Sequence, residues 1–206
     1  MQRLAHYVTA SLALLLLSAV SQAAPITTAA TLAGANENPA NGSTATGNTV
    51  VVLDTATHQL RVAVVFNGLS ANATGAHIHC CTSPPGNVGV ATTLPAFAGF
   101  PLGVTSGSLD QTYDTTQAST WNPAFVTNNG GTTAGAEAAL AAGLASGQAY
   151  LNVHTSANPG GEIRGFLVAQ APPLTQAIPT MSEWGMGALV LLLGIAAWTV
   201  IRRRAA

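Results

Sequence analysis

The chain has 206 residues and a formal net charge of −1, and only 6% of its residues are Asp, Glu, Lys or Arg. So few positive charges leave no basic patch that would displace counterions, which argues against nucleic-acid binding. Setting aside the apolar segments at both ends leaves about 150 residues, enough for one domain with a sizeable core.

The first 23 residues have the pattern of a secretory signal peptide. Arg3 supplies a positive charge, Tyr7–Val20 forms an apolar stretch, and Ser21-Gln22-Ala23 places small residues where a signal peptidase reads them. We expect cleavage after Ala23. The alternative is an uncleaved anchor, for which the apolar stretch is short.

Residues 24–170 have the pattern of an all-β domain. Short segments rich in β-branched residues alternate with turn signals, which favours an antiparallel β-sandwich. One short helix is expected at Ala134–Ser146, from an i, i+4 apolar face and the C-terminal Gly147. The expected strands are Ala29–Gly34, Thr49–Leu53, Leu60–Phe66, Ala76–Cys81, Ala149–His154 and Glu162–Val168.

The segment Phe97–Gly131 is long and has no clear periodicity. We expect Tyr113, Trp121 and Phe125 to hold it against the rest of the domain.

The two cysteines, Cys80 and Cys81, are adjacent. Bonded to each other, they cannot link distant segments. In an oxidising compartment they can form a vicinal disulfide, pair with another chain, or bind metal, and the sequence does not choose among these.

Three histidines are candidates for a metal site. Residues two apart in a strand face the same side, so His77 and His79 share one face with Cys81, and His154 lies on the polar face of a later strand. Imidazole is a good ligand for copper or zinc. The three rings meet only if the two strands are neighbours. The alternative is that all three are hydrogen-bonded structural residues.

Glu162 and Arg164 also share a strand face, and we expect them to form a structural ion pair or to bind backbone groups. The preceding Asn158-Pro159-Gly160-Gly161 is expected to be a turn that needs a positive φ at glycine. We find no nucleophile–base motif, which makes an enzyme the less favoured interpretation.

Several of these segments resemble the CHRD domain, first noted in chordin. The matching segments are Gly34–Pro39, Ala76-His77-Ile78-His79, Tyr150–Thr155 and Pro159–Gly165. The resemblance covers roughly residues 29–168. Cys80 departs from it, because the family usually has glycine after the second histidine.

The histidine pattern is also similar to that of copper-zinc superoxide dismutase. That resemblance implies His77, His79 and His154 as copper ligands and Arg164 as a guide for the anion. A bridging histidine and a zinc loop are not evident in this chain.

Residues 171–177 form a linker, and residues 178–206 have the pattern of a sorting signal. Met186–Ile201 is almost wholly apolar and is followed by Arg202-Arg203-Arg204. This order predicts a transmembrane helix whose arginines stay cytoplasmic. The preceding motif consists of Ile178, Pro179, Thr180, Met181, Ser182, Glu183, Trp184 and Gly185.

This tail resembles the Ile-Pro-Thr-Leu class of exosortase sorting signals, with Met181 in place of leucine. The resemblance implies export and recognition by an exosortase-type processing enzyme. We therefore expect an envelope protein, anchored in the membrane or released at the surface. Its domain is interpreted as a binding or structural module for a surface polymer or protein, or as a redox-type domain with copper or zinc at His77, His79 and His154.

Overall fold

The structure is a computed structural model that describes residues 24–170 and 183–204. The expected signal peptide, the linker and the motif residues Ile178–Ser182 lie outside the described residues. Two compact units are present, residues 1–169 and 170–206. In the first unit the strands are β1 (Ile26–Ala33), β2 (Thr46–Asp54), β3 (Gln59–Asn67), β4 (Ala73–Cys80), β5 (Gly107–Asp114), β6 (Ala149–Thr155), β7 (Ile163–Phe166) and β8 (Val168–Ala169).

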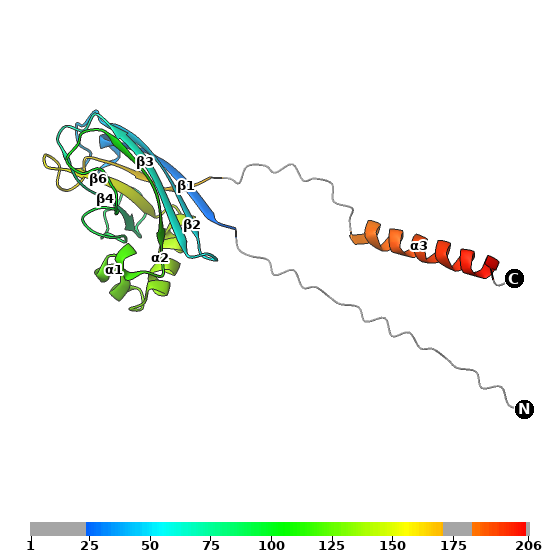
Figure 1. The fold of residues 1–206 in the computed structure, drawn as a ribbon. Helices are drawn as coiled ribbons and strands as arrows, with labels where there is room; N and C mark the ends of the chain where they lie inside the picture. Colours follow the sequence, from blue (N-terminus) through cyan, green and yellow to red (C-terminus); the bar gives the residue numbers. More distant parts are fainter. Residues whose placement is uncertain (1–23, 171–182, 205–206) are drawn as a thin grey trace, which may run out of the picture. The chain divides into compact units, whose positions relative to one another are not determined.

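All eight strands join one antiparallel sheet with the order β4-β6-β7-β1-β2-β3-β5, and β8 also pairs with β1. The all-β, antiparallel prediction is therefore confirmed. The expected sandwich takes the form of one continuous sheet that curls into a half-barrel (Figure 1). Curling of one sheet brings its two ends toward each other, so a second sheet is not needed to enclose a core.

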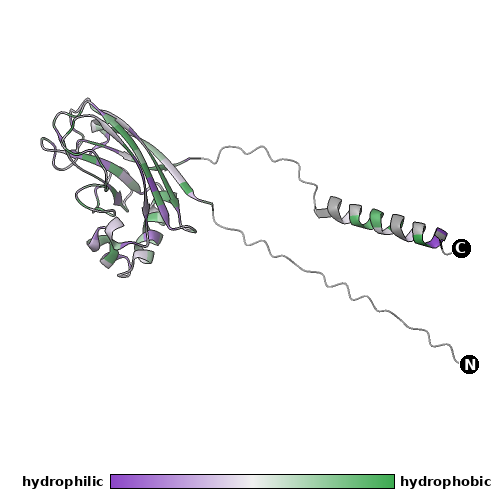
Figure 2. Cartoon of the chain, in the orientation of Figure 1, coloured by the Kyte–Doolittle hydropathy of each residue, from purple (hydrophilic) through white to green (hydrophobic). Residues whose placement is uncertain are grey.

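The core lies on one face of this sheet, and alternation along the strands determines which residues enter it. In β3, Leu60, Val62, Val64 and Phe66 are buried while their neighbours are more exposed. Figure 2 shows the resulting apolar bands on the strands. Ile78 of β4 belongs to the same apolar cluster as Val62, so the two ends of the sheet share one core.

The helices of the first unit are short and lie mostly between β5 and β6. They are η1 (Gly34–Asn36), η2 (Ala118–Thr120), α1 (Pro123–Asn128) and α2 (Thr133–Ala145). The single predicted helix corresponds to α2, which begins at an N-cap where the Thr132 hydroxyl accepts a hydrogen bond from the Gly135 amide. α1 was not predicted, although the Asn122 side chain caps it and Pro123 opens it.

Strand β5 was also missed, because it falls in the segment Phe97–Gly131. Within that segment Trp121 and Phe125 are buried and stacked, and Tyr113 stacks on Phe97. The expectation that these aromatic residues hold the segment to the domain is confirmed.

The second unit contains α3 (Glu183–Arg204), and the Arg202 guanidinium lies over the Trp198 ring. Among the residues that the structure describes, no helix has the length and apolar character needed to cross a membrane. The transmembrane helix expected from the sequence is therefore not confirmed.

Candidate metal centre

The first requirement for the histidine cluster, that its two strands be neighbours, is met. β4 pairs with β6 in antiparallel register, with His77 opposite Asn152 and His79 opposite Tyr150. His154 lies opposite Gly75, one diagonal step from His77. The three rings therefore project from the same face, opposite to the one that carries Ile78 into the core.

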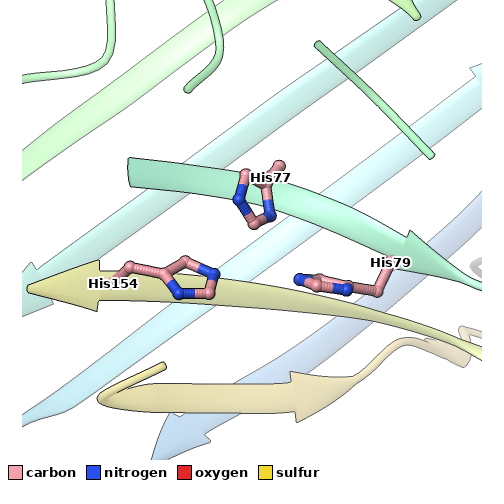
Figure 3. Close-up of side chains that lie close together, drawn as sticks. All are labelled: His77, His79 and His154. Carbon is pink, nitrogen blue, oxygen red and sulfur yellow. The ribbon is translucent and has the colours of Figure 1, made fainter. Parts of the chain in front are cut away.

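The three rings point toward one another (Figure 3). The His77 ring centroid lies 4.8 Å from that of His79 and 4.5 Å from that of His154, and the last two are 6.0 Å apart. Each ring offers one nitrogen such that the three nitrogens lie within 4.8 Å of one another. Metal–nitrogen bonds of about 2 Å would place three ligand atoms closer together than this.

Hydrogen bonds to the backbone orient two of the rings. His79 Nδ1 lies 2.7 Å from the Val88 carbonyl oxygen, and His154 Nδ1 lies 3.0 Å from that of Pro159. In a neutral ring Nδ1 then carries the proton and leaves a lone pair on Nε2. In His79 and His154 Nε2 is buried without a hydrogen-bond partner, and so is Nδ1 of His77. Buried polar atoms are normally paired, so three orphaned nitrogens in one place call for a ligand.

The surroundings keep these imidazoles neutral. Burial, together with the neighbouring His154 and His79, lowers the pKa of His77 to about 3. Burial lowers the pKa of His79 to about 4, although its hydrogen bond to Val88 acts in the opposite direction. The pKa of His154 is lowered for the same reason. Neutral imidazole is the form that binds metal, and at neutral pH all three rings are in this form.

Arg164 holds the loop that covers this face. Its side chain is 1% exposed, and its guanidinium donates to Asn36 O (2.6 Å), Pro85 O (2.7 Å) and Asn87 Oδ1 (2.6 Å). The guanidinium also lies over the Tyr150 ring, which in turn stacks on His79. Since it is buried and committed to these acceptors, Arg164 does not guide an anion as the dismutase analogy implied.

Glu162 and Arg164 form no ion pair with each other, but Arg164 meets the other expectation by binding the backbone carbonyls of Asn36 and Pro85. Arg164 lies 3.7 Å from the carboxylate of Glu37. Glu162 precedes β7 and accepts hydrogen bonds from Ser43, Ser70, Thr155 and Asn158. Glu162 thus ties together the β1–β2, β3–β4 and β6–β7 connections, and Arg164 ties the β4–β5 connection to that same β1–β2 connection.

The expected glycine turn before these residues is confirmed at Gly161, whose φ is 130°. A side chain there would overlap the carboxamide of Asn152. Glycine at this position therefore lets the turn pack against the strand that carries His154.

Cys81 does not belong to the cluster. The residues that could hold a metal are His77, His79 and His154, and Cys81 is bonded to Cys80 in a vicinal disulfide. The structure thus selects one of the three states that the sequence left open for the cysteines. Both sulfur atoms lie near the Ala139 carbonyl of α2, at 3.9 Å and 3.5 Å.

Glu37 is a residue near this site that sequence reasoning missed. Burial raises its pKa to about 7, and the charge of Arg164 and the contact with Asn152 only partly offset that effect. Its Oε1 and the Oδ1 of Asn152 are both buried without partners. A lone glutamate in the turn-rich segment 34–39 gives no sign of this environment, because the strands that enclose it are far away in sequence.

Comparison with protein families agrees with this architecture. The model of the CHRD domain matches residues 28–167, which include all three histidines, Arg164 and Glu162. The chain belongs to the CHRD domain family. The model of the IPTL-CTERM motif matches residues 176–205 of the same chain. No curated protein and no solved structure matches the chain.

In this CHRD protein the matched tail is a sorting motif, and it fits an exported protein associated with the cell envelope. The motif lies in a different unit from the CHRD domain. Of its residues, Glu183, Trp184 and Gly185 form the first turn of α3. The cysteine pair stands beside the histidine cluster in sequence, directly after His79.

Proposed function

We propose that this protein is an exported CHRD protein, sorted to the cell envelope through its tail, whose domain binds one copper or zinc ion. The observation that carries the proposal is the convergence of three buried ring nitrogens without partners, from His77, His79 and His154. Three histidine ligands leave a coordination position for water or a small molecule. Two of the rings are oriented by backbone carbonyls, as metal-bound histidines usually are.

The alternative that the three histidines are only structural is less well supported. A structural histidine is stabilised by pairing its buried nitrogen atoms, and an unpaired buried group costs about 1–3 kcal/mol. Three such unpaired groups close together would each lower the stability of the fold. Phenylalanine or leucine at the same positions would pack as well without that cost. Binding of one cation satisfies all three together.

The interpretation of the domain as a surface or matrix module stays a prediction. It is compatible with the proposal, because a displayed domain can hold a metal ion. In the described part of the chain no contact singles out a face for a polymer or for another protein.

The proposal is tested by metal binding to the protein purified without a histidine tag. The protein is stripped with a chelator, then titrated separately with Zn²⁺ and Cu²⁺, and the bound metal is measured by elemental analysis. We expect one ion per chain. His77→Ala should weaken binding by more than the roughly 10–100-fold that loss of an outer-shell partner costs.

His58→Ala is the matched control. His58 lies in the β2–β3 turn, its side chain is 50% exposed, and it pairs with Glu137. Its removal should leave the affinity unchanged. The proposal fails if the folded protein takes up neither ion, or if both variants bind as tightly as the unmodified chain.

A further inference from the structure

The vicinal disulfide is a poor stabilising crosslink. A disulfide stabilises a fold mainly by closing a loop in the unfolded chain, and the effect grows with the length of that loop. Cys80 and Cys81 are adjacent in sequence, so their bond closes no loop and restricts only their own dipeptide. Stabilisation by a crosslink therefore does not explain why two adjacent cysteines lie at the end of β4.

The position of the bond makes it accessible. Cys80 is buried, with 4% exposure, whereas Cys81 is exposed. Both residues line a cavity of about 350 Å³ that opens to solvent, together with Val88 and Val90 of the covering loop and Phe125 and Asn129 near α1. A small molecule can therefore approach the Sγ atom of Cys81, while Cys80 faces the interior.

The opposite side of the disulfide is held against α2. Gly143 faces the two sulfur atoms, and a side chain there would overlap both of them. The neighbouring backbone is tied on each side, because the Cys80 amide donates to Gly89 O and the Thr82 amide donates to Gln148 O. The two sulfur atoms therefore stay together when their bond is broken, and the same pair can re-form.

We propose that Cys80–Cys81 is a thiol–disulfide exchange site that is reduced by a small dithiol entering this cavity. The thiolate of the dithiol attacks Cys81 Sγ, the Cys80–Cys81 bond breaks, and Cys80 leaves as a thiolate that takes up a proton. The second thiol of the reductant then attacks the reductant's other sulfur, the one bonded to Cys81 in the mixed disulfide, and Cys81 is released as a thiol. The reductant loses two electrons and becomes a cyclic disulfide, and the protein gains two thiols.

Both sulfur atoms lie near α2 and neither belongs to the histidine cluster, so the exchange itself needs no metal ion. The test of the exchange uses the full chain without added metal. The protein is incubated with dithiothreitol, quenched with iodoacetamide and weighed as an intact molecule, while circular dichroism monitors the fold. We expect alkylation at the exposed Cys81 with an unchanged spectrum, and no alkylation of protein that has not been treated with dithiothreitol. Alkylation only after denaturation would overturn the proposal.

Two pairs of variants define the route of attack. With Cys80→Ser the remaining Cys81 should form a mixed disulfide with glutathione at least about tenfold faster than the remaining Cys80 does with Cys81→Ser, because exposure controls thiol reactivity. Ala124→Trp places a large ring at the cavity wall and should slow reduction of the intact pair several-fold. Thr127→Trp, on the exposed side of α1 and outside the cavity lining, is its control. Equal rates within both pairs would contradict entry through the cavity.

Discussion

At the scale of single residues, Glu37 has the most unusual environment in the domain. The carboxyl is 9% exposed and its pKa is raised to about 7, so the folded protein holds its proton at pH values where the unfolded chain has released it. Stability from this group is present below pH 4.5 and is lost as the pH rises through 7. Glu37→Gln keeps the shape and stays neutral.

We therefore expect Glu37→Gln to be more stable than the unmodified protein at about pH 8 and equal to it at about pH 4. The difference should reach a few kcal/mol, since one pKa unit corresponds to about 1.4 kcal/mol. Urea denaturation at several pH values measures it. Glu162→Gln is the contrasting variant: burial would raise the pKa of Glu162, but the bonds from Thr155, Ser70 and Ser43 lower it. That variant should be destabilised at neutral pH, and a Glu37→Gln variant that behaves likewise would refute the argument.

The candidate site was predictable from sequence only within single strands, where successive side chains alternate between the two faces. The rule that strand residues two apart share a face placed His77 beside His79 and put His154 on a polar face. Pairing between β4 and β6 decides whether the three histidines meet, and in that pairing His77 lies opposite Asn152, 75 positions away. The partner of Arg164 was missed for the same reason, because Glu37 is 127 positions away and lies outside any strand.

At the scale of elements, the loop between β4 and β5 depends on Arg164. This one side chain holds Pro85 and Asn87 of the loop and Asn36 of η1, and Asn87 in turn donates to Asn38 O. The same loop supplies the Val88 carbonyl that orients His79. Removing the guanidinium therefore takes the donor away from these acceptors, leaves the buried Glu37 without its cation, and loosens the cover of the histidines.

We expect Arg164→Met to lower the free energy of unfolding by about 3 kcal/mol or more, the cost of removing one partner of a buried charged pair, here the pair with Glu37. Thermal unfolding followed by circular dichroism measures it. Arg61→Met is the matched control, because the Arg61–Asp110 pair is about half exposed on both sides, and such pairs contribute about 1 kcal/mol or less. Equal losses in the two variants would contradict the role given to Arg164.

Prediction succeeded for strands with an apolar sequence and failed for a strand that is mostly polar. β2 and β3 are central strands with regular inward and outward positions; β3 was predicted to within one residue at each end, whereas the first three residues of β2 were missed. β5 is an edge strand in which most residues are exposed, so its sequence Gly107–Asp114 carries no apolar period. The curl of the sheet was not predictable either, since it depends on twist accumulated over all the strands.

At the scale of the whole molecule, the sheet separates two kinds of interior. One face encloses an apolar core that contains Ile78, Leu151 and Val153. The other face, at the β4-β6-β7 end, buries His77, Asn152 and Arg164 under loops. The apolar core drives folding through burial of surface, whereas the polar interior makes the stability of the folded protein depend on pH.

The metal-free protein should therefore lose stability as the pH falls from about 7 to about 5. In this window His77 and His79, with pKa values lowered to about 3 and 4, stay neutral in the folded protein, and both take up protons on unfolding. Glu37 acts in the opposite sense by up to one proton, so the net proton uptake on unfolding is close to zero near pH 7 and rises to about one near pH 5. Stability should therefore fall slowly at first and by roughly 1.4 kcal/mol per pH unit near pH 5, measured by urea denaturation. Glu37→Gln removes the opposing group and should steepen the fall, and a flat profile in both proteins would show that the histidines are not buried as neutral rings.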